Sequence, residues 1–423
     1  MACMACGHDA PRPSKLGPSG LGLCDGPVAG SLDGRPPEPY HRPRPRRTNP
    51  DPCRAIRCPL HARATAMPDF ANLCKAFLCQ GEPAYVPAVE YAIDRAIKAQ
   101  VLGRQPATID DEAEFFLGCG YDFVPVLFGM RLTLVERALA AGPGGPMRVA
   151  QAANGGDPSH RTVRLWAEEG TGAIADLAAF DRFEWPDAQA YPYQDIARLG
   201  RILPAEAKVI PVVGYVFAAA WMLVGFERFC LDLAEGGSLA KRVIDRVGQI
   251  QLQVVENLLQ FDCVGAVCMP DDLAYTHGLM VRPEFLRRYV FPWHQRIGQR
   301  VRARGLPFLF HSDGRYTAVI EDLIQCGYHA IHPCEPASMD IVELKQRYGG
   351  RLCLCGNINL DRTLTLGTPE EVEEEVRQRI RTVGPGGGYC CGSSNSVTEY
   401  VPLANFQAML SAIRRYGRYP IAC

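Results

Sequence analysis

Short, nearly continuous apolar runs recur along the chain from about residue 84 onward, and amphipathic segments separate them. Such runs are typical of parallel strands that are covered on both faces, since a half-exposed strand would alternate apolar and polar positions. The alternation of these runs with helical segments therefore predicts an α/β protein with a parallel sheet. The predicted strands are 84–90, 122–128, 208–214, 263–269, 306–311, 328–333, 351–357 and 387–392.

The clearest predicted helix lies in TPEEVEEEVRQRIRTVG, residues 368–384. Thr368 can cap it, Pro369 suits the first helical position, and Glu371 completes a capping box. Acidic residues fill the first turn and arginines the last, as the helix dipole favours. Gly384 then predicts the end of the helix.

Eight strand–helix units predict a (β/α)8 TIM barrel over residues 67–423, with an insertion after the second strand. The pattern is weakest in residues 129–205, where HRTVRLWAEEGTGAI is typical of an inserted hairpin. Residues 1–66 are rich in Pro, Gly and Arg and have no periodicity, which predicts a disordered tail. Cysteines and histidines in this tail are irregularly spaced, so a plain tail is preferred to a zinc knuckle, and Met67 is an alternative start.

Charge and composition exclude several classes of protein. The chain has 45 basic and 46 acidic residues, which does not favour general binding to nucleic acid or to a membrane surface. The longest apolar stretch, 209–226, contains glycines and a strand-like start, so we interpret it as buried core. The 18 cysteines are scattered without a secretory signal before them, which predicts reduced thiols in a cytoplasmic protein.

Polar residues stand at or just after the ends of the predicted strands. In a barrel the carboxyl ends of all strands meet on one rim, where the chemistry takes place. We therefore predict a site there. The candidates are Glu90, Asp271, Asp272, His311, Asp313, Glu335, Asn357, Cys390 and Cys391.

Two pairs among these candidates have more than one interpretation. His311 and Asp313 could be metal ligands, an acid–base pair, or caps of the next helix. Of the adjacent Asp271 and Asp272, one is expected to cap a helix or pair with an arginine. The other would face the cavity, where two close carboxylates raise one pKa.

The eighth strand carries two further features. Alternation directs one of Cys390 and Cys391 inward and the other toward the helices, and we choose Cys391 as inward because it is nearer the strand's end. Cys353 and Cys355 are interpreted as core. The turn GSSN, residues 392–395, offers N–H groups and hydroxyls for an anion, although an ordinary strand-to-helix turn has the same composition.

Several segments of the chain resemble the uroporphyrinogen decarboxylase superfamily, and the resemblance covers roughly residues 67–420. It implies a (β/α)8 barrel and one of two chemistries: decarboxylation of the acetate arms of uroporphyrinogen, or methyl transfer between corrinoid proteins and thiols or methylated substrates. In the methyltransferases, zinc is held by a His-x-Cys motif and a later cysteine. The segments are FHSDGRYTAVIEDLIQCGYHAIHPCEP, GNINLDRTLTLGTPEEVEEEV, GGGYCCGSSNSVTEYVPLANFQAML and PDDLAYTHGLMVRPEFLRRYVFPW.

Two departures separate the two chemistries. The decarboxylases carry arginines near the first strand that hold substrate carboxylates, whereas this chain has Glu90 in VPAVEYAIDRAI. A carboxylate there would repel a polyanionic tetrapyrrole. In the methyltransferase comparison, His311 matches the first zinc ligand and Cys391 the late cysteine, but Asp313 replaces the middle cysteine and makes a harder site.

The resemblance therefore favours a metal-assisted methyltransferase that moves a methyl group between a small substrate or thiol and a corrinoid protein. We expect zinc on His311, Asp313 and Cys391, with Glu335 as a candidate fourth ligand. The corrinoid is expected on a separate protein, because the chain has no room for an appended cobalamin domain. The predicted catalytic residues are Asp271, Asp272, Glu335 and Asn357, and the predicted substrate-binding residues are Glu90, Ser393, Ser394 and Asn395.

Two alternatives stay open. The first is a decarboxylase of the uroporphyrinogen type, in which Asp271 or Asp272 would stabilise a protonated ring. The second is a non-catalytic barrel that binds a tetrapyrrole or corrinoid. The sequence leaves open the methyl donor, the acceptor and the oligomeric state, with a homodimer as one alternative.

Overall fold

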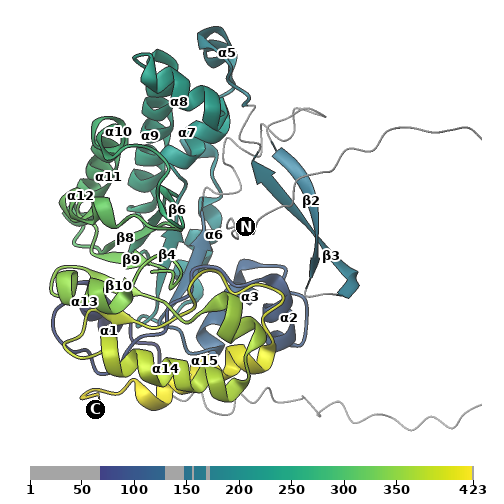
Figure 1. Cartoon of the computed structure of the whole chain (residues 1–423). Helices are drawn as coiled ribbons and strands as arrows, with labels where there is room; N and C mark the ends of the chain where they lie inside the picture. The colour runs from purple at the N-terminus through teal and green to yellow at the C-terminus, as the bar shows by residue number, and fades with distance from the viewer. Residues whose placement is uncertain (1–66, 129–146, 155–156, 168–171, 422–423) are drawn as a thin grey trace, which may run out of the picture. The chain divides into compact units, whose positions relative to one another are not determined.

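The computed structural model describes residues 67–128, 147–154, 157–167 and 172–421, and these residues belong to one compact unit. The predicted tail, 1–66, lies outside the described residues. The centre of the unit is a curled, seven-stranded parallel sheet of the kind found in TIM-barrel-like folds (Figure 1). Its strand order is β1 (Phe123–Leu127), β4 (Lys208–Val212), β5 (Val267–Pro270), β8 (Phe308–His311), β9 (Ala330–His332), β10 (Cys353–Cys355) and β11 (Tyr389–Cys390).

The first of the eight predicted strands is not regular. Segment 84–93 is joined to the sheet by isolated parallel bridges, Ala88 with Cys391 and Ile93 with Val397. On its other side, the ring of Tyr91 lies 6.0 Å from that of Phe123 on β1. The segment thus contacts both edge strands, but Pro83 and Pro87 have no N–H to donate, which explains why a regular ladder does not form.

Helices pack against the outer face of the sheet, for example α13 against β10 and α11 against β8 (Figure 1). None of the helices in the described ranges has both the length and the apolar content needed to cross a bilayer. The α-helices are α1 (Phe70–Phe77), α2 (Arg95–Leu102), α3 (Ile109–Gly118), α5 (Leu177–Arg182), α6 (Tyr193–Ile202), α7 (Phe217–Val224), α8 (Phe226–Ala234), α9 (Ser238–Leu258), α10 (Pro283–Phe285), α11 (Phe291–Ala303), α12 (Ile320–Cys326), α13 (Ile341–Tyr348), α14 (Pro369–Val383) and α15 (Leu403–Tyr416). Shorter helical turns are η1 (Ala188–Ala190), η2 (Leu286–Val290), η3 (Thr317–Val319) and η4 (Leu360–Leu364).

The insertion predicted after the second strand contains a hairpin, but not at the expected residues 160–174, of which 160–167 belong to a single strand. Strands β2 (Met147–Asn154) and β3 (Asp157–Ala167) pair antiparallel, with a register shift between Ala153 and Asn154. A second, much smaller antiparallel pair, β6 (Ala274–Tyr275) and β7 (Gly278–Leu279), follows β5.

Helix α14 confirms the predicted cap. The Thr368 side chain accepts from the Glu371 N–H, and the Glu371 side chain accepts from the Thr368 N–H. The predicted stop differs in detail, because Gly384 has φ −63° and is not left-handed. Its carbonyl instead accepts a 2.7 Å hydrogen bond from the Tyr419 hydroxyl, which satisfies a group at the end of the helix.

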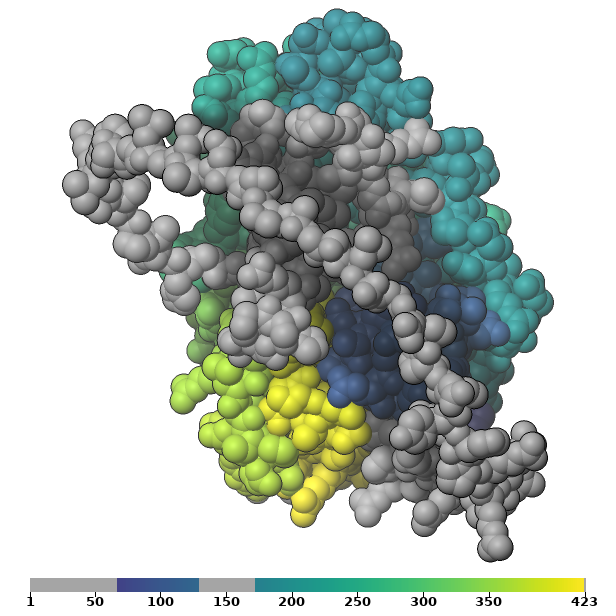
Figure 2. Space-filling model, turned by 90° about the vertical axis from the view of Figure 1, so that its right-hand side faces the viewer, coloured from purple at the N-terminus to yellow at the C-terminus, as the bar shows by residue number. Residues whose placement is uncertain are grey.

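Early and late parts of the chain share one core. The rings of Phe115 on α3 and Phe406 on α15 stack at 6.3 Å. Arg414, also on α15, donates to the carbonyl of Cys119. Figure 1 shows α3 beside α15, and Figure 2 shows the early (blue) and late (yellow) segments in contact on one face. This packing keeps segment 84–93 and β11 in place for the bridges between them.

Candidate active site

Four neighbouring strands end in residues that can bind a metal or a proton. His311 ends β8 and pairs in register with His332, which ends β9. Cys355 ends β10 and pairs in register with Cys390, which ends β11. Leu354 lies opposite Ile331, so Cys355 follows beside His332 and the four residues form one row at the carboxyl end of the sheet.

The two imidazoles of this row are in direct contact. Their Nδ1 atoms lie 2.8 Å apart and the rings are nearly parallel, with centroids 5.0 Å apart. Burial lowers the pKa of His311 to about 4, and burial together with His311 lowers that of His332. Both rings are therefore neutral near pH 7, and one Nδ1–H donates to the other Nδ1. The sequence reasoning missed His332, whose only signal was its place at the end of the apolar run YHAIHP.

Two carboxylates, Asp272 and Asp313, lie beside His311, and a third, Glu335, is linked to Asp313 through Asn395. The Asp313 N–H donates to Asp272 (3.2 Å), and the Asn395 amide donates to Asp313 (2.9 Å) and to Glu335 (3.3 Å). Desolvation raises the pKa of Asp272 to about 7, with added effects from the neighbouring Asp271 and Glu335 charges. Desolvation also raises the pKa of Glu335. Several acids thus lie so close together that one of them tends to keep its proton.

Three of these side chains can meet on one ion. One atom each of Asp272, His311 and Asp313 lies within 4.8 Å of the other two, and His311 Nε2 is 3.6 Å from Asp313 Oδ1. If Nε2 binds an ion, Nδ1–H is left to donate to His332, which is the usual outer contact of a histidine ligand. A neutral imidazole and two carboxylates therefore fit a divalent cation such as Zn²⁺.

Cys391, the third predicted zinc ligand, is not part of this group, and our assignment of it as the inward sulfur is wrong. Burial raises its pKa to about 12, it is hydrogen-bonded to Tyr389, and Arg379 and Glu375 of α14 are among the charges that act on it. Its sulfur therefore lies on the helix side of β11. The inward sulfur is that of Cys390. Side chains alternate between the two faces of a strand, and Cys390 is paired in register with Cys355, so these two side chains lie on the same face.

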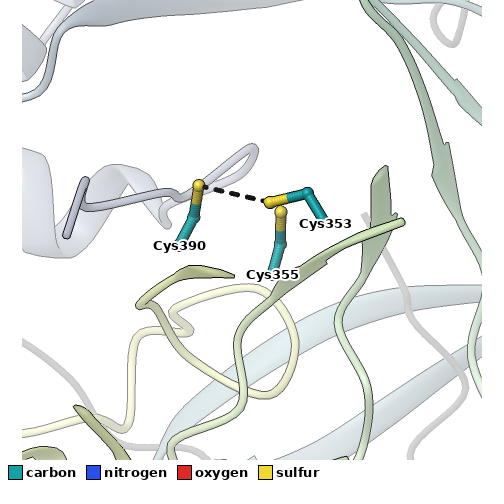
Figure 3. Close-up of side chains that lie close together, drawn as sticks. All are labelled: Cys353, Cys355 and Cys390. Atoms are coloured by element: carbon teal, nitrogen blue, oxygen red, sulfur yellow. Dashed lines mark hydrogen bonds between the residues drawn. The ribbon is translucent and has the colours of Figure 1, made fainter. Parts of the chain in front are cut away.

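Cys390 belongs to a second group, whose other two members, Cys353 and Cys355, the sequence reasoning assigned to the core. Its Sγ lies 3.8 Å from that of Cys353, and the Cys355 sulfur completes a set within 4.8 Å (Figure 3). Burial raises the pKa of Cys353 and Cys390. Burial would also raise that of Cys355, but hydrogen bonds from the other two thiols outweigh it and lower the value to about 6. The available signal was the C-x-C spacing, which puts two side chains on one strand face.

Asp271 does not face this site. It is fully buried, accepts from the N–H groups of Phe217 (2.8 Å) and Ala218 (2.9 Å), and lies 2.9 Å from His294 Nε2. These contacts hold the first turn of α7 to the end of β5. The structure therefore gives Asp271 the capping role and leaves Asp272 at the site, which resolves the two roles that the sequence left open for this pair.

The predicted anion site at residues 392–395 is already occupied by a side chain of the protein. Glu90 is fully buried and accepts from Ser393 N–H at 2.6 Å, with Ser393 Oγ 2.8 Å from its second oxygen. Ser394 Oγ accepts from Leu360 N–H at 3.0 Å. The predicted substrate-binding roles of Glu90, Ser393 and Ser394 are therefore not supported by this geometry, and only Asn395 reaches the carboxylates.

Asn357, another predicted catalytic residue, is buried at the end of β10. Its amide donates to the carbonyl of Cys334 at 2.8 Å, whereas its Oδ1 has no hydrogen-bond partner among the described residues. His332 Nε2 is in the same situation. Buried polar atoms of this kind are few in native proteins and point to a site that receives a ligand or water.

Comparisons with known proteins agree with this architecture. The chain is 27% identical over 224 residues to a uroporphyrinogen decarboxylase of Anaeromyxobacter dehalogenans, covering 51% of this chain and 62% of that protein. It is 23% identical over 297 residues to one of Pseudoalteromonas translucida, covering 62% and 76%. The chain thus spans about three fifths of the length of the first of these relatives.

Among solved structures, the chain is similar to a methyltransferase from Methanosarcina mazei. The TM-score is 0.59 at 16% sequence identity, covering 82% of this chain and 98% of that one, which shows a shared fold. A model of the family described as uroporphyrinogen decarboxylase (URO-D) matches residues 170–416, more than half of the chain. The chain therefore belongs to the uroporphyrinogen decarboxylase family.

Proposed function

We propose that this chain is a metal-assisted methyltransferase that moves a methyl group between a small substrate or thiol and a separate corrinoid protein. The observation that carries the proposal is the group of Asp272, His311 and Asp313, whose donor atoms lie within 4.8 Å of one another at the strand ends. Neutral imidazole and carboxylates in one place suit a cation.

The charge around this group also favours a cation over a polycarboxylate substrate. In the described part of the chain, Asp272 and Glu335 accept hydrogen bonds from neutral donors: backbone N–H groups, Ser338 and Asn395. A substrate with several carboxylates would meet like charge, whereas a divalent ion would stabilise the ionised acids.

Each residue then has a definite task. Asp272, His311 and Asp313 would hold the ion, and His332 would orient the His311 ring through the Nδ1 contact. Glu335, with its raised pKa, would take up or return the proton of a substrate thiol. A bound ion supplies Lewis-acid chemistry, which lowers the pKa of a thiol or polarises an ether oxygen.

Similarity supports this proposal only at the level of the fold. The solved structure from Methanosarcina mazei is named a methyltransferase, and its alignment covers 98% of that chain. Methyl transfer to or from a corrinoid would need a partner protein.

The test is turnover with methylcob(III)alamin as donor and a small alkyl thiol as acceptor, before and after removal of metal. Chelation should lower the rate at least about 100-fold, the scale of a metal's contribution to a barrier, and added Zn²⁺ should restore it. His311→Ala should lose both the ion of the Asp272 group and turnover. The matched control is His277→Ala, an exposed histidine after β6, which should retain both. Turnover that is unchanged after complete metal removal would contradict the proposal.

Decarboxylation of a porphyrinogen is the second candidate function, supported by the names of the sequence relatives. It predicts release of CO2 from uroporphyrinogen by chelated protein, with loss of activity in Asp272→Asn. If neither assay shows turnover while a corrinoid or porphyrin binds tightly, the chain is a non-catalytic binding barrel.

A further inference from the structure

We propose that Cys353, Cys355 and Cys390, on the adjacent strands β10 and β11, form a second metal site for a thiophilic ion such as Zn²⁺. This site is distinct from the Asp272 group. We call these three residues the thiol cluster. The proposal does not rest on the proposed function, because it uses other residues and another ligand chemistry.

The spacing of the sulfurs fits one ion. The Sγ atoms of Cys353 and Cys390 lie 3.8 Å apart, and all three sulfurs lie within 4.8 Å of one another (Figure 3). Three thiolates on a tetrahedral ion with Zn–S bonds of about 2.3 Å would be about 3.8 Å apart. The cluster therefore needs only a small contraction to bind.

The backbone holds these sulfurs in place without a ligand. Cys353 and Cys355 lie two residues apart on β10 and share one face, and β11 places Cys390 in register with Cys355. All three side chains are fully buried, with 0% exposure. A pre-formed set of donors on adjacent strands loses little conformational entropy when a metal binds.

A second, independent observation points to a ligand at this place. The Tyr91 hydroxyl is buried and has no hydrogen-bond partner among the described residues. The Tyr91 ring lies 4.9 Å from the ring of His332, the neighbour of Cys355 in the row of strand ends, and burial, followed by the sulfurs of Cys355, Cys268, Cys390 and Cys353, raises the pKa of Tyr91. A buried O–H without a partner is costly, and metal-bound thiolates are strong acceptors that would satisfy it.

The surroundings can also balance the charge of an occupied site. Three thiolates and Zn²⁺ carry one net negative charge. Lys345 on α13 donates to the carbonyl of Gly387, two residues before β11, and its ammonium acts against the rise that burial causes in the pKa of Cys353. One positive charge near one net negative charge removes much of the cost of burying the ion.

An ion here would fasten β10 to β11, directly beside His332 in the row of strand ends. Three thiolates leave one position of a tetrahedral ion for a water, and full burial would keep substrate away from it, so the site would be structural. It would stabilise the part of the sheet in which consecutive strands pair over only two residues.

The test uses Co²⁺ as the probe, because thiolate ligands give this ion an intense near-ultraviolet charge-transfer band. The full chain is refolded with Co²⁺ or Zn²⁺, and metal content, the band and thermal unfolding are recorded. We expect the band in the wild type and its loss in Cys353→Ser and Cys390→Ser, with about one ion fewer per chain. His311→Ala should keep the band, which separates failure of this proposal from failure of the proposed function.

Two controls address other cysteines. Cys326→Ser changes a buried cysteine outside the cluster, and a double variant, Cys53→Ser with Cys58→Ser, removes two of the five thiols of residues 1–66; both should keep the band. If the cluster variants do not fold, alkylation of the wild type in partial denaturant decides. Zn²⁺ should then protect Cys353, Cys355 and Cys390, but not Cys326. No band in the wild type, a band that survives all cluster variants, or no protection would each overturn the proposal.

Discussion

His311 and His332 share a hydrogen bond between their Nδ1 atoms, which lie 2.8 Å apart. Only one of these two nitrogens can carry the proton, so the pair fixes the tautomers of both rings together. If an ion occupies His311 Nε2, the proton must lie on His311 Nδ1, and His332 then carries its own proton on Nε2.

Replacing His332 should therefore weaken metal binding without removing a ligand. His332→Phe is expected to lower the affinity of the Asp272 group for Zn²⁺ by about 10- to 100-fold, the usual effect of an outer-contact loss. His332→Gln, whose amide oxygen can still accept from His311, should recover much of it. Competition titration with a chromophoric chelator measures both, and His277→Ala serves as the unchanged control. Equal affinity in His332→Phe and the wild type would contradict this role.

Substitution by Ala should affect mainly stability at Asp271 and mainly metal binding at the adjacent Asp272. Asp271→Ala leaves two N–H groups at the start of α7 and His294 without their acceptor, so we expect a loss of about 3–5 kcal/mol in the free energy of unfolding. Asp272→Ala removes one carboxylate from a crowded acidic group and should cost less than about 1 kcal/mol while abolishing metal binding at that group. Urea denaturation together with metal analysis distinguishes the pair. Similar stability losses in both variants would be inconsistent with these assignments.

Glu90 should make the stability of the protein depend on pH. Ser393 Oγ contacts both Glu90 and the carbonyl of Asn395. The hydroxyl has one proton, so it cannot donate fully to both. If Glu90 is protonated, Glu90 donates to Ser393 Oγ and the hydroxyl donates to the Asn395 carbonyl. Burial raises the pKa of Glu90 to about 8, despite the opposing hydrogen bonds from Ser393. The folded protein therefore holds the Glu90 proton more tightly than the unfolded chain does. The contribution of this proton to the free energy of unfolding is full below about pH 4.5 and is lost as pH rises toward 8.

The matched variant for this effect is Glu90→Gln, which keeps a neutral side chain of the same shape. The free energy of unfolding of wild type and variant is measured by denaturation from pH 5 to 9. As pH rises, the wild type should become progressively less stable relative to the variant. A difference that is constant across this range would show that Glu90 is ionised in the folded protein.

Gly392 is expected to tolerate no side chain. A Cβ at this position would lie 2.0 Å from the carbonyl oxygen of Val89 and 3.2 Å from Glu90 Oε1. Gly392→Ala should therefore push segment 84–93 away from β11 and destabilise the fold by at least about 1–3 kcal/mol, the usual cost of overpacking. Gly278→Ala, which has open space around its Cβ, is the control for thermal unfolding. Unchanged stability in Gly392→Ala would show that the contact adjusts freely.

The sequence predicted the strands that carry the site because their apolar runs are unbroken, and it predicted α14 because Thr368 and Glu371 form a local cap. It also predicted Asp272, His311, Asp313 and Glu335 on one rim, and the structure brings these side chains together. These features depend on neighbours in the chain or on the general geometry of parallel sheets.

The remaining errors depend on contacts that are distant in sequence. Strand β11 is only two residues long, too short to show which of Cys390 and Cys391 points inward, and an error of one residue exchanges the faces. The role of His332 depends on its contact with His311 in the neighbouring strand, which the local sequence does not indicate. Likewise, the role of Asp271 follows from the start of α7, more than 50 residues earlier in the chain.

The link between Glu90 and Ser393 joins positions 303 residues apart. Contacts at such a separation require nearly the whole intervening chain to be ordered first. Closing so long a loop is entropically unfavourable until other native contacts offset the lost entropy. Joining the two ends of the sheet should thus be a late event in folding. A nascent chain that has not yet emerged past Ser393 would expose segment 84–93 and both sheet edges to other proteins.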